Sequence, residues 1–267
     1  MEAMFMKVKS TLIILSLVLI CTLKASAQDE KPFYYLSFEG GAHVIFSQIP
    51  DYDFIRGDLS SYGGGSVSET IYGQSDYWYA SVKLNKRTTN QRFAFGTGIR
   101  YTQFNSSLGK SAGESNSSYF YMLLREDGSS TEYLKVTDIE EHSGFIGIPI
   151  EYRFFLNPRV YSKFYIKAAA SVNYNVFSSR SAGFYNSSMD KYEHDITSKF
   201  DEPSDFFIPL YFGAGLILGN DQKSNVSLEF LVPSFVLTKN VSGILEPVTG
   251  FGFQLNIQIP VNKNHEA

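Results

Sequence analysis

Between Gly144 and Phe177, apolar and polar side chains alternate over two runs that are longer than an average soluble strand. The second run has one continuous apolar side, made of Phe164, Ile166, Ala168, Ala170, Val172, Tyr174 and Val176. Its other side carries Lys167 and Asn173, and the first run sets Ile146, Ile148 and Ile150 against Glu151 and Arg153. A period of two predicts extended strands. One apolar face and one charged face are typical of a strand between lipid and a polar lumen.

The same alternation recurs eight times along the chain. We predict strands at residues 34–48, 76–84, 93–105, 144–155, 160–177, 206–219, 226–237 and 250–261. Long polar connections (49–75, 106–142 and 178–205) alternate with short turns (85–92, 156–159 and 219–225), and a medium connection covers 239–249. This sorting predicts an all-β fold, an eight-stranded antiparallel transmembrane up-and-down β-barrel with long extracellular loops. The segment YFYMLLRE inside the longest connection is either a short hairpin arm or a strand extension.

Composition agrees with an antiparallel barrel: 16% of residues are aromatic, only 19% are charged, and the mean hydropathy is -0.12. Aromatic residues cluster near the expected strand ends, for example Tyr77, Trp78 and Tyr79, where we expect interfacial girdles. Pro149, Pro209 and Pro233 fall within expected strands. Because proline lacks a ladder donor, we expect bulges or local breaks there, with Pro233 at the outer end of its strand.

The N-terminus has the three parts of a cleaved export signal. Lys7 and Lys9 precede an apolar run at 11–23, and Ala25-Ser26-Ala27 provides a cleavage site. We therefore expect a signal peptide at 1–27 and a single barrel domain at 28–267; a lipoprotein signal ending at Cys21 is the alternative. Cleavage after Ala27 removes the one cysteine and leaves 20 basic and 26 acidic residues, a net charge of -6. This balance argues against nucleic acid as a partner.

Six charged residues fall on the sides of the strands that should face the lumen: Glu39, Arg100, Glu151, Arg153, Lys167 and Glu229. An eight-stranded barrel is narrow enough for side chains to fill it. We expect these charges to pair, because an unpaired buried charge costs several kcal/mol. The simplest interpretation is a structural plug of ion pairs. The alternative is a proton or ion path through a narrow gated channel.

The sequence gives little support for catalysis. Among the histidines, His43 lies on an expected strand and should face inward, while His142, His194 and His265 fall in loops or the tail. No H-E-x-x-H, G-x-S-x-G or phosphate-loop motif is present. We expect no enzyme activity, no cofactor and no metal. An envelope lipid-modifying enzyme would require a His–Ser–acid cluster near the bilayer.

Charge is sorted between the two ends of the expected barrel. The short turns carry basic residues: Lys86, Arg87, Arg92, Arg159 and Lys223. The long loops carry acidic ones: Asp51, Asp53, Asp58, Glu69, Glu126, Asp127, Asp138, Glu140, Glu141, Asp190, Glu193, Asp195, Asp201, Glu202 and Asp205. These loops either only increase solubility or bind cations among lipopolysaccharide phosphates. The expected partners are outer-membrane lipid (lipopolysaccharide) and a surface or periplasmic protein, and the expected state is a monomer.

Three short motifs carry a family resemblance: Gly147-Ile148-Pro149-Ile150-Glu151-Tyr152, Gly96-Thr97-Gly98-Ile99 and Ile208-Pro209-Leu210-Tyr211. In order and spacing the chain resembles the small outer-membrane β-barrel family that includes PorT-like proteins, with distant similarity to OmpX and OmpA barrels. The resemblance implies a location in the outer membrane of a Gram-negative bacterium, a structural or interaction role and help to protein secretion. The chain departs from the usual aromatic last residue, because it continues past Val261 to Ala267.

Overall fold

A computed structural model describes residues 33–57, 71–110, 119–127, 130–158, 161–219 and 223–261. The expected signal peptide at 1–27, with Cys21, lies outside these ranges, as does the tail after Val261. In the described ranges, no helix is both long enough and apolar enough to cross a membrane.

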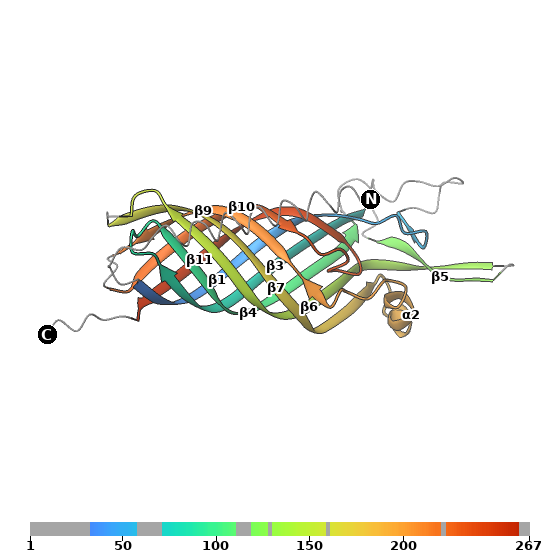
Figure 1. The fold of residues 1–267 in the computed structure, drawn as a ribbon. Coiled ribbons are helices and arrows are strands. Elements are labelled where there is room, and N and C mark those ends of the chain that lie inside the picture. Colours follow the sequence, from blue (N-terminus) through green and yellow to red (C-terminus); the bar gives the residue numbers. More distant parts are fainter. Residues whose placement is uncertain are drawn as a thin grey trace, which may run out of the picture.

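Eight long strands form a closed antiparallel ring, which confirms the predicted fold (Figure 1). They are β1 (Phe33–Gln48), β3 (Ile71–Arg87), β4 (Phe93–Lys110), β6 (Ser130–Phe155), β7 (Ser162–Phe184), β9 (Pro209–Leu218), β10 (Asn225–Val236) and β11 (Glu246–Pro260). Each pairs with its neighbours in chain order, and β1 pairs with β11, where Tyr35 lies opposite Pro260. Closure supplies a backbone partner on both sides of every strand.

The short elements gather at one end of the ring, where β5 and α2 are labelled in Figure 1. They are β2 (Ile55–Arg56), β5 (Phe120–Asp127), β8 (Phe206–Phe207), the 3-10 helix η2 (Ser187–Tyr192) and α2 (Glu193–Thr197). β5 pairs with the first part of β6, so the segment YFYMLLRE is a hairpin arm. We call this end the cap end; the short turns lie at the other end.

Five strands are longer at the cap end than the sequence predicted. β3 begins at Ile71, β4 continues to Lys110, β6 begins at Ser130, β7 continues to Phe184 and β11 begins at Glu246. The predictions for these ends were wrong because the extensions lack an apolar outward face. Apolar alternation detects only the part of a strand whose outer side is apolar, whereas backbone pairing continues beyond it.

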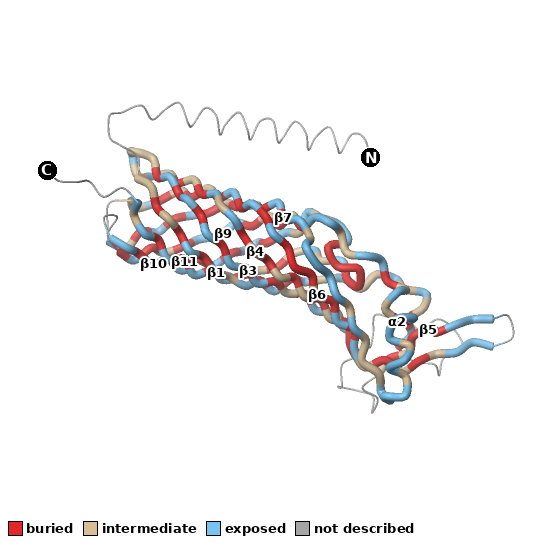
Figure 2. Tube along the Cα trace, turned by 90° about the horizontal axis from the view of Figure 1, so that it is seen from below, coloured by how far each residue is buried: buried red, intermediate tan, exposed pale blue. Residues whose placement is uncertain are grey.

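The two faces of the strands separate as predicted. Outward residues are apolar and exposed, among them Ile99 at 68%, Ile150 at 63% and Leu228 at 61%. Inward residues are buried, so buried and exposed positions alternate along each strand (Figure 2). The aromatic clusters split in the same way: Trp78 faces out, whereas Tyr77 and Tyr79 are buried inside. The prediction that whole clusters form interfacial girdles was therefore wrong for the inward members.

Glycines on the inward face lie opposite large side chains. Gly41 is the cross-strand partner of Tyr79, Gly252 of His43 and Gly215 of Tyr165. A Cβ at Gly41 would lie 2.5 Å from the Tyr79 hydroxyl oxygen. At these positions the glycine leaves room inside the barrel for the large side chain of the adjacent strand.

The prolines interrupt pairing locally, as expected. The registers of β10 with β9 and with β11 shift between Leu231 and Ser234, around Pro233. β10 nevertheless continues to Val236, so Pro233 does not mark its outer end. Pro209 starts β9, and Ile208 separates this strand from β8, with its backbone N–H donating to Thr238 Oγ1 at 2.9 Å. The β4–β6 pairing skips Pro149 without a change of register.

Gly41→Ala is expected to destabilise the barrel by about 1–3 kcal/mol, the usual cost of overpacking a filled interior. The adjacent Gly40→Ala provides a matched control, because a Cβ there meets nothing nearer than the Tyr79 carbonyl oxygen at 3.8 Å. The measurement is the urea midpoint of unfolding in lipid vesicles. Equal midpoints for the two variants would contradict the packing described above.

Candidate functional site: the barrel interior and its capped end

All six charged residues predicted to face the lumen lie inside the barrel and are buried. They come from strands all around the ring: Glu39 on β1, Arg100 on β4, Glu151 and Arg153 on β6, Lys167 on β7 and Glu229 on β10. Their charged groups meet in one cluster, which also includes Lys83 from β3. We call these seven residues the charge cluster.

Glu39 receives hydrogen bonds from several walls of the barrel. Its Oε1 accepts from Arg100 Nη2 at 2.8 Å and from Ser81 Oγ at 3.1 Å. Its Oε2 accepts from Lys83 and Gln254. Donors on β3, β4 and β11 therefore hold one carboxylate, which is what a buried anion requires.

Glu151 and Glu229 share their cationic partners. Lys167 Nζ lies 2.7 Å from Glu151 Oε1 and 2.7 Å from Glu229 Oε2. Arg153 Nη2 lies 3.1 Å from an oxygen of each carboxylate. Tyr165 adds a hydroxyl that donates to Glu229 Oε1 at 2.5 Å. Because every cation of the cluster lies within 4 Å of at least two carboxylates, the cluster is a single network of ion pairs.

Lys83 is the member that sequence reasoning missed. Lys83 lies between the apolar residues Val82 and Leu84 on an expected strand. The alternation that assigned the other six charges to the interior therefore predicts the same for Lys83. Its Nζ lies 2.6 Å from Glu151 Oε1 and its side chain is fully buried. The cluster therefore contains four cations and three carboxylates, whereas the sequence predicted three of each sign.

A layer of aromatic rings covers the charge cluster on its cap side. The centroid of the Tyr79 ring lies 4.0 Å from the guanidinium carbon of Arg100. Beyond it, the His43 ring stacks on Tyr77 with centroids 4.4 Å apart. His43 Nδ1 lies 2.9 Å from Ser234 Oγ, and both residues are about 1% exposed. This His–Ser pair is enclosed by the barrel wall, so lipid on the outside cannot reach it.

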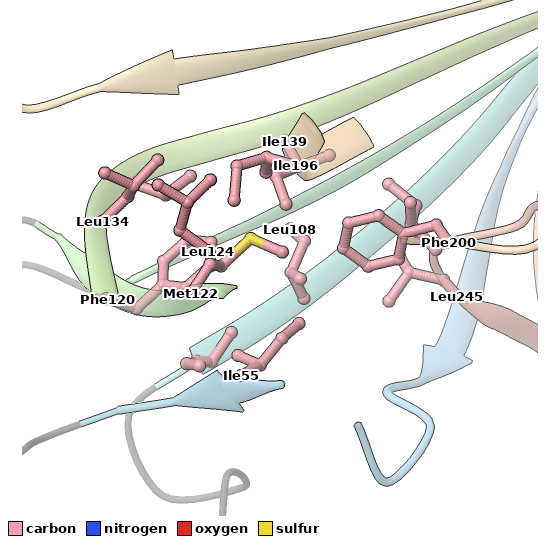
Figure 3. Packing of buried hydrophobic residues seen from close by; sticks show 13 residues of the cluster. Ile55, Leu108, Phe120, Met122, Leu124, Leu134, Ile139, Ile196, Phe200 and Leu245 are labelled. Carbon is pink, nitrogen blue, oxygen red and sulfur yellow. The ribbon is translucent and has the colours of Figure 1, made fainter. Parts of the chain in front are cut away.

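A second hydrophobic core fills the space beyond the aromatic layer (Figure 3). It draws on β2, β3, β4, β5, β6, α2, the segment after α2 and the connection before β11, and we call it the cap core. Its buried members are Ile55, Ile71, Leu108, Phe120, Met122, Leu124, Leu134, Val136, Ile139, Ile196, Phe200, Ile244 and Leu245. The long connections are therefore packed against one another over the end of the barrel, where the sequence predicted polar loops apart from the segment YFYMLLRE.

The connection between β10 and β11 folds inward. Val241 is fully buried among Ile45, Phe104, Phe145 and other inward-facing side chains of the wall. Ile244 and Leu245 continue into the cap core. The three apolar residues in this short connection were a signal that sequence reasoning did not use. This segment, residues 241–245, is the inward loop.

Arg180 and Glu141 join the inward loop to the cap. Arg180 Nη2 lies 2.5 Å from Glu141 Oε2, and the guanidinium also donates to the carbonyl oxygens of Thr197, Phe200 and Asp201. Glu141 Oε1 accepts the backbone N–H of Gly243 at 3.0 Å. The prediction that Glu141 belongs to a solvated acidic loop was wrong: it lies on β6 and is 2% exposed.

Tyr52 adds a further bond to the inward loop. Its hydroxyl donates to the Gly243 carbonyl oxygen at 2.9 Å, and burial raises the pKa of this hydroxyl above its usual value. Of the other acidic residues predicted in loops, Asp138 and Glu140 lie on β6. Asp58 and Glu69 fall outside the described ranges. Within those ranges, no group of three or more metal-ligating side chains could hold an ion.

No protein-family model and no curated protein matches the chain. Among solved structures, it is similar to the outer membrane protein OprG from Pseudomonas aeruginosa, at 11% identity and a TM-score of 0.35, over 86% of this chain and 97% of that one. It is also similar to the translocator domain of the autotransporter NalP from Neisseria meningitidis, at 5% identity and a TM-score of 0.32, over 95% and 96%. It is similar as well to the transport unit of the autotransporter AIDA-I from Escherichia coli, at 8% identity and a TM-score of 0.23, over 88% of this chain and 92% of that one. Likenesses this distant carry no argument about function.

Glu39→Gln is expected to destabilise the barrel by about 3–5 kcal/mol, because it leaves four buried cations with two carboxylates. Lys83→Met removes the surplus cation and is expected to cost clearly less, about 1–2 kcal/mol. Urea unfolding, followed by the gel mobility of the folded form, measures both. Equal losses of stability would contradict the view that charge balance decides the stability of the interior.

Proposed function

We propose that this protein is an exported barrel of the outer membrane of a Gram-negative bacterium, and that it acts as a structural or interaction protein, not as an enzyme. The observation that carries the proposal is the combination of an apolar exterior with an interior filled by side chains from end to end. Hydrocarbon is the environment in which a closed ring with such an exterior is stable. A filled interior leaves the cap as the part available to a partner.

The cap offers a surface suited to interaction. The Tyr119 ring lies 4.8 Å from that of Tyr185 and 5.6 Å from that of Tyr121, and Lys135 Nζ lies 4.6 Å from the Tyr119 centroid. The hydrogen bond between Tyr119 and Lys135 lowers the pKa of the tyrosine and raises that of the lysine. Tyr185 is 60% exposed. Tyrosine is enriched at protein interfaces, where its rigid ring gives contact area at low entropic cost.

The specific role that we favour is the one implied by the PorT-like resemblance, help to a protein secretion system. In this role, the cap binds a surface protein of that system or the short-turn end binds a periplasmic one, and the barrel anchors both in the lipopolysaccharide-containing membrane. We propose a monomer, because one chain closes the whole ring.

The membrane proposal predicts that the full-length protein fractionates with outer membranes and migrates differently on gels before and after boiling. The interaction proposal predicts that a surface cross-linker captures a defined partner, and that the Tyr119→Ser/Tyr185→Ser variant loses it. That variant should keep its heat-modifiable migration, since neither ring belongs to the barrel interior. Recovery in aqueous extracts would refute the first proposal; an undiminished cross-link would refute the second.

A narrow gated barrel is the second candidate. It is favoured by the ion pair of Arg180 with Glu141, which holds the inward loop and the segment 197–201 together. In a gate, the loss of such a contact would let these segments move apart and open a path. In this candidate, opening would also require the charge cluster to re-pair.

Arg180→Gln is the test of this candidate. It should loosen residues 197–201 and 241–245, measured as faster backbone hydrogen exchange there. The gated candidate further expects current across planar bilayers from this variant. Arg125→Gln is the control, because both side chains of its 3.4 Å pair with Glu132 are at least half exposed and the pair is worth about 1 kcal/mol or less. A loosened cap without current would exclude the gate.

A further inference from the structure

The outer wall of the barrel has a hollow with the dimensions of a ligand site. It lies over β1, β3, β4 and β11, has a volume of about 810 Å³, and is lined by Phe38, Gly40, Ala80, Val82, Ile99 and Leu255, among others. Ligand clefts in proteins commonly measure about 300–1,000 Å³. We call it the wall groove.

The groove exists because small residues coincide at one place on an otherwise bulky surface. Gly40 is the cross-strand partner of Ala80 on one side and of Leu255 on the other. The neighbouring outward residues Phe38 and Val82 are large and stand 44% and 47% exposed. The wall is therefore lower at Gly40 and Ala80 than around them. Tyr101 lines the groove as well, and its ring lies 5.5 Å from that of Trp78.

A cation lies on the same strand, towards the short-turn end. Lys86 is exposed on β3 opposite Tyr34, and its Nζ lies 5.9 Å from the Tyr34 ring. From Lys86 to Ala80 the strand advances six residues, or about 20 Å at about 3.4 Å each. With a tilt of about 40° this is about 15 Å of depth, half of a hydrocarbon core of about 30 Å. The wall groove therefore lies deeper in the membrane than Lys86 by about the thickness of one leaflet.

We propose that the wall groove is a specific site for one anionic glycerophospholipid of the leaflet at the short-turn end. The acyl chain runs down β1 and β3 past Leu36 and Leu84 and ends in the groove beside Gly40. The phosphate lies at Lys86, where an ammonium group beside an aromatic ring is typical of a membrane interface. This proposal rests on the proposed membrane location. It goes beyond that location by specifying the lipid and the place where it binds.

Two variants separate the two halves of the site. Gly40→Leu fills the groove, and the nearest atom to its Cβ is the Tyr79 carbonyl oxygen at 3.8 Å, so the wall accommodates it. Lys86→Gln removes the charge at the interface. The matched control is Ala168→Leu, which adds the same side chain to the outward face of β7, directly across the ring from β1.

The experiment is native mass spectrometry of the full-length protein in mild detergent, titrated with phosphatidylglycerol or phosphatidylethanolamine. We expect one tightly held phosphatidylglycerol in the wild type and in Ala168→Leu. Gly40→Leu should weaken this binding about tenfold or more. Lys86→Gln should abolish the preference for phosphatidylglycerol and keep weak binding of both lipids.

Three results would overturn the proposal: equal lipid binding in Gly40→Leu and Ala168→Leu, no preference between the two lipids in the wild type, or a dimer that Gly40→Leu converts to monomer. The last result would assign the groove to a second copy of the chain. Heat-modifiable migration and flotation with vesicles are measured on the same samples. A wild type that fails them refutes the membrane proposal itself, whereas one that passes them and shows equal lipid binding refutes only this site.

Discussion

Backbone pairing around the closed ring is the constraint on which the rest of this structure depends. Every long strand has an antiparallel neighbour on each side, and β1 joins β11, so the chain has no free edge along the barrel wall. Only in this arrangement can strands face an apolar medium, because no water is there to satisfy an unpaired N–H or C=O group. The outward side chains can then be apolar throughout, and the polar ones are directed inward.

Eight strands make the interior narrow, and this narrowness explains its chemistry. Side chains from opposite walls meet at the centre, so charges that are far apart in the sequence become neighbours, such as Glu39 and Lys167 at 3.8 Å. Tyr79, His43 and Tyr165 each have a glycine as a cross-strand partner, and aromatic rings separate the charge cluster from the apolar cap. The buried charges are tolerated because they are paired. The inward loop is buried because it packs against aromatic rings and aliphatic side chains.

The sequence predicts the ring well and the cap poorly, for physical reasons. The alternation of apolar and polar residues indicates which side of a strand faces lipid, and this was enough to predict eight strands and to assign six charges to the interior. The alternation does not indicate how a connection between strands folds. Val241 and Leu245 lie in a connection for which the sequence predicted only a medium length, and Glu141 was grouped with solvated acids although it is buried beside Arg180. Tertiary packing decides these positions, and a single sequence shows it only as isolated apolar residues in otherwise polar segments.

The bond from Gln254 to Glu39 joins residues 215 positions apart, and it has a consequence for how the chain reaches its native state. Contacts of such long range form late, after most of the loop-closure entropy has been lost. Until the first and last strands meet, the carboxylates and ammonium groups of the unfinished sheet lie on a concave face that must stay hydrated. Pairing of β1 with β11 therefore excludes water from the interior and completes the ion-pair network of the charge cluster in one step. Partly assembled forms consequently have little stability of their own.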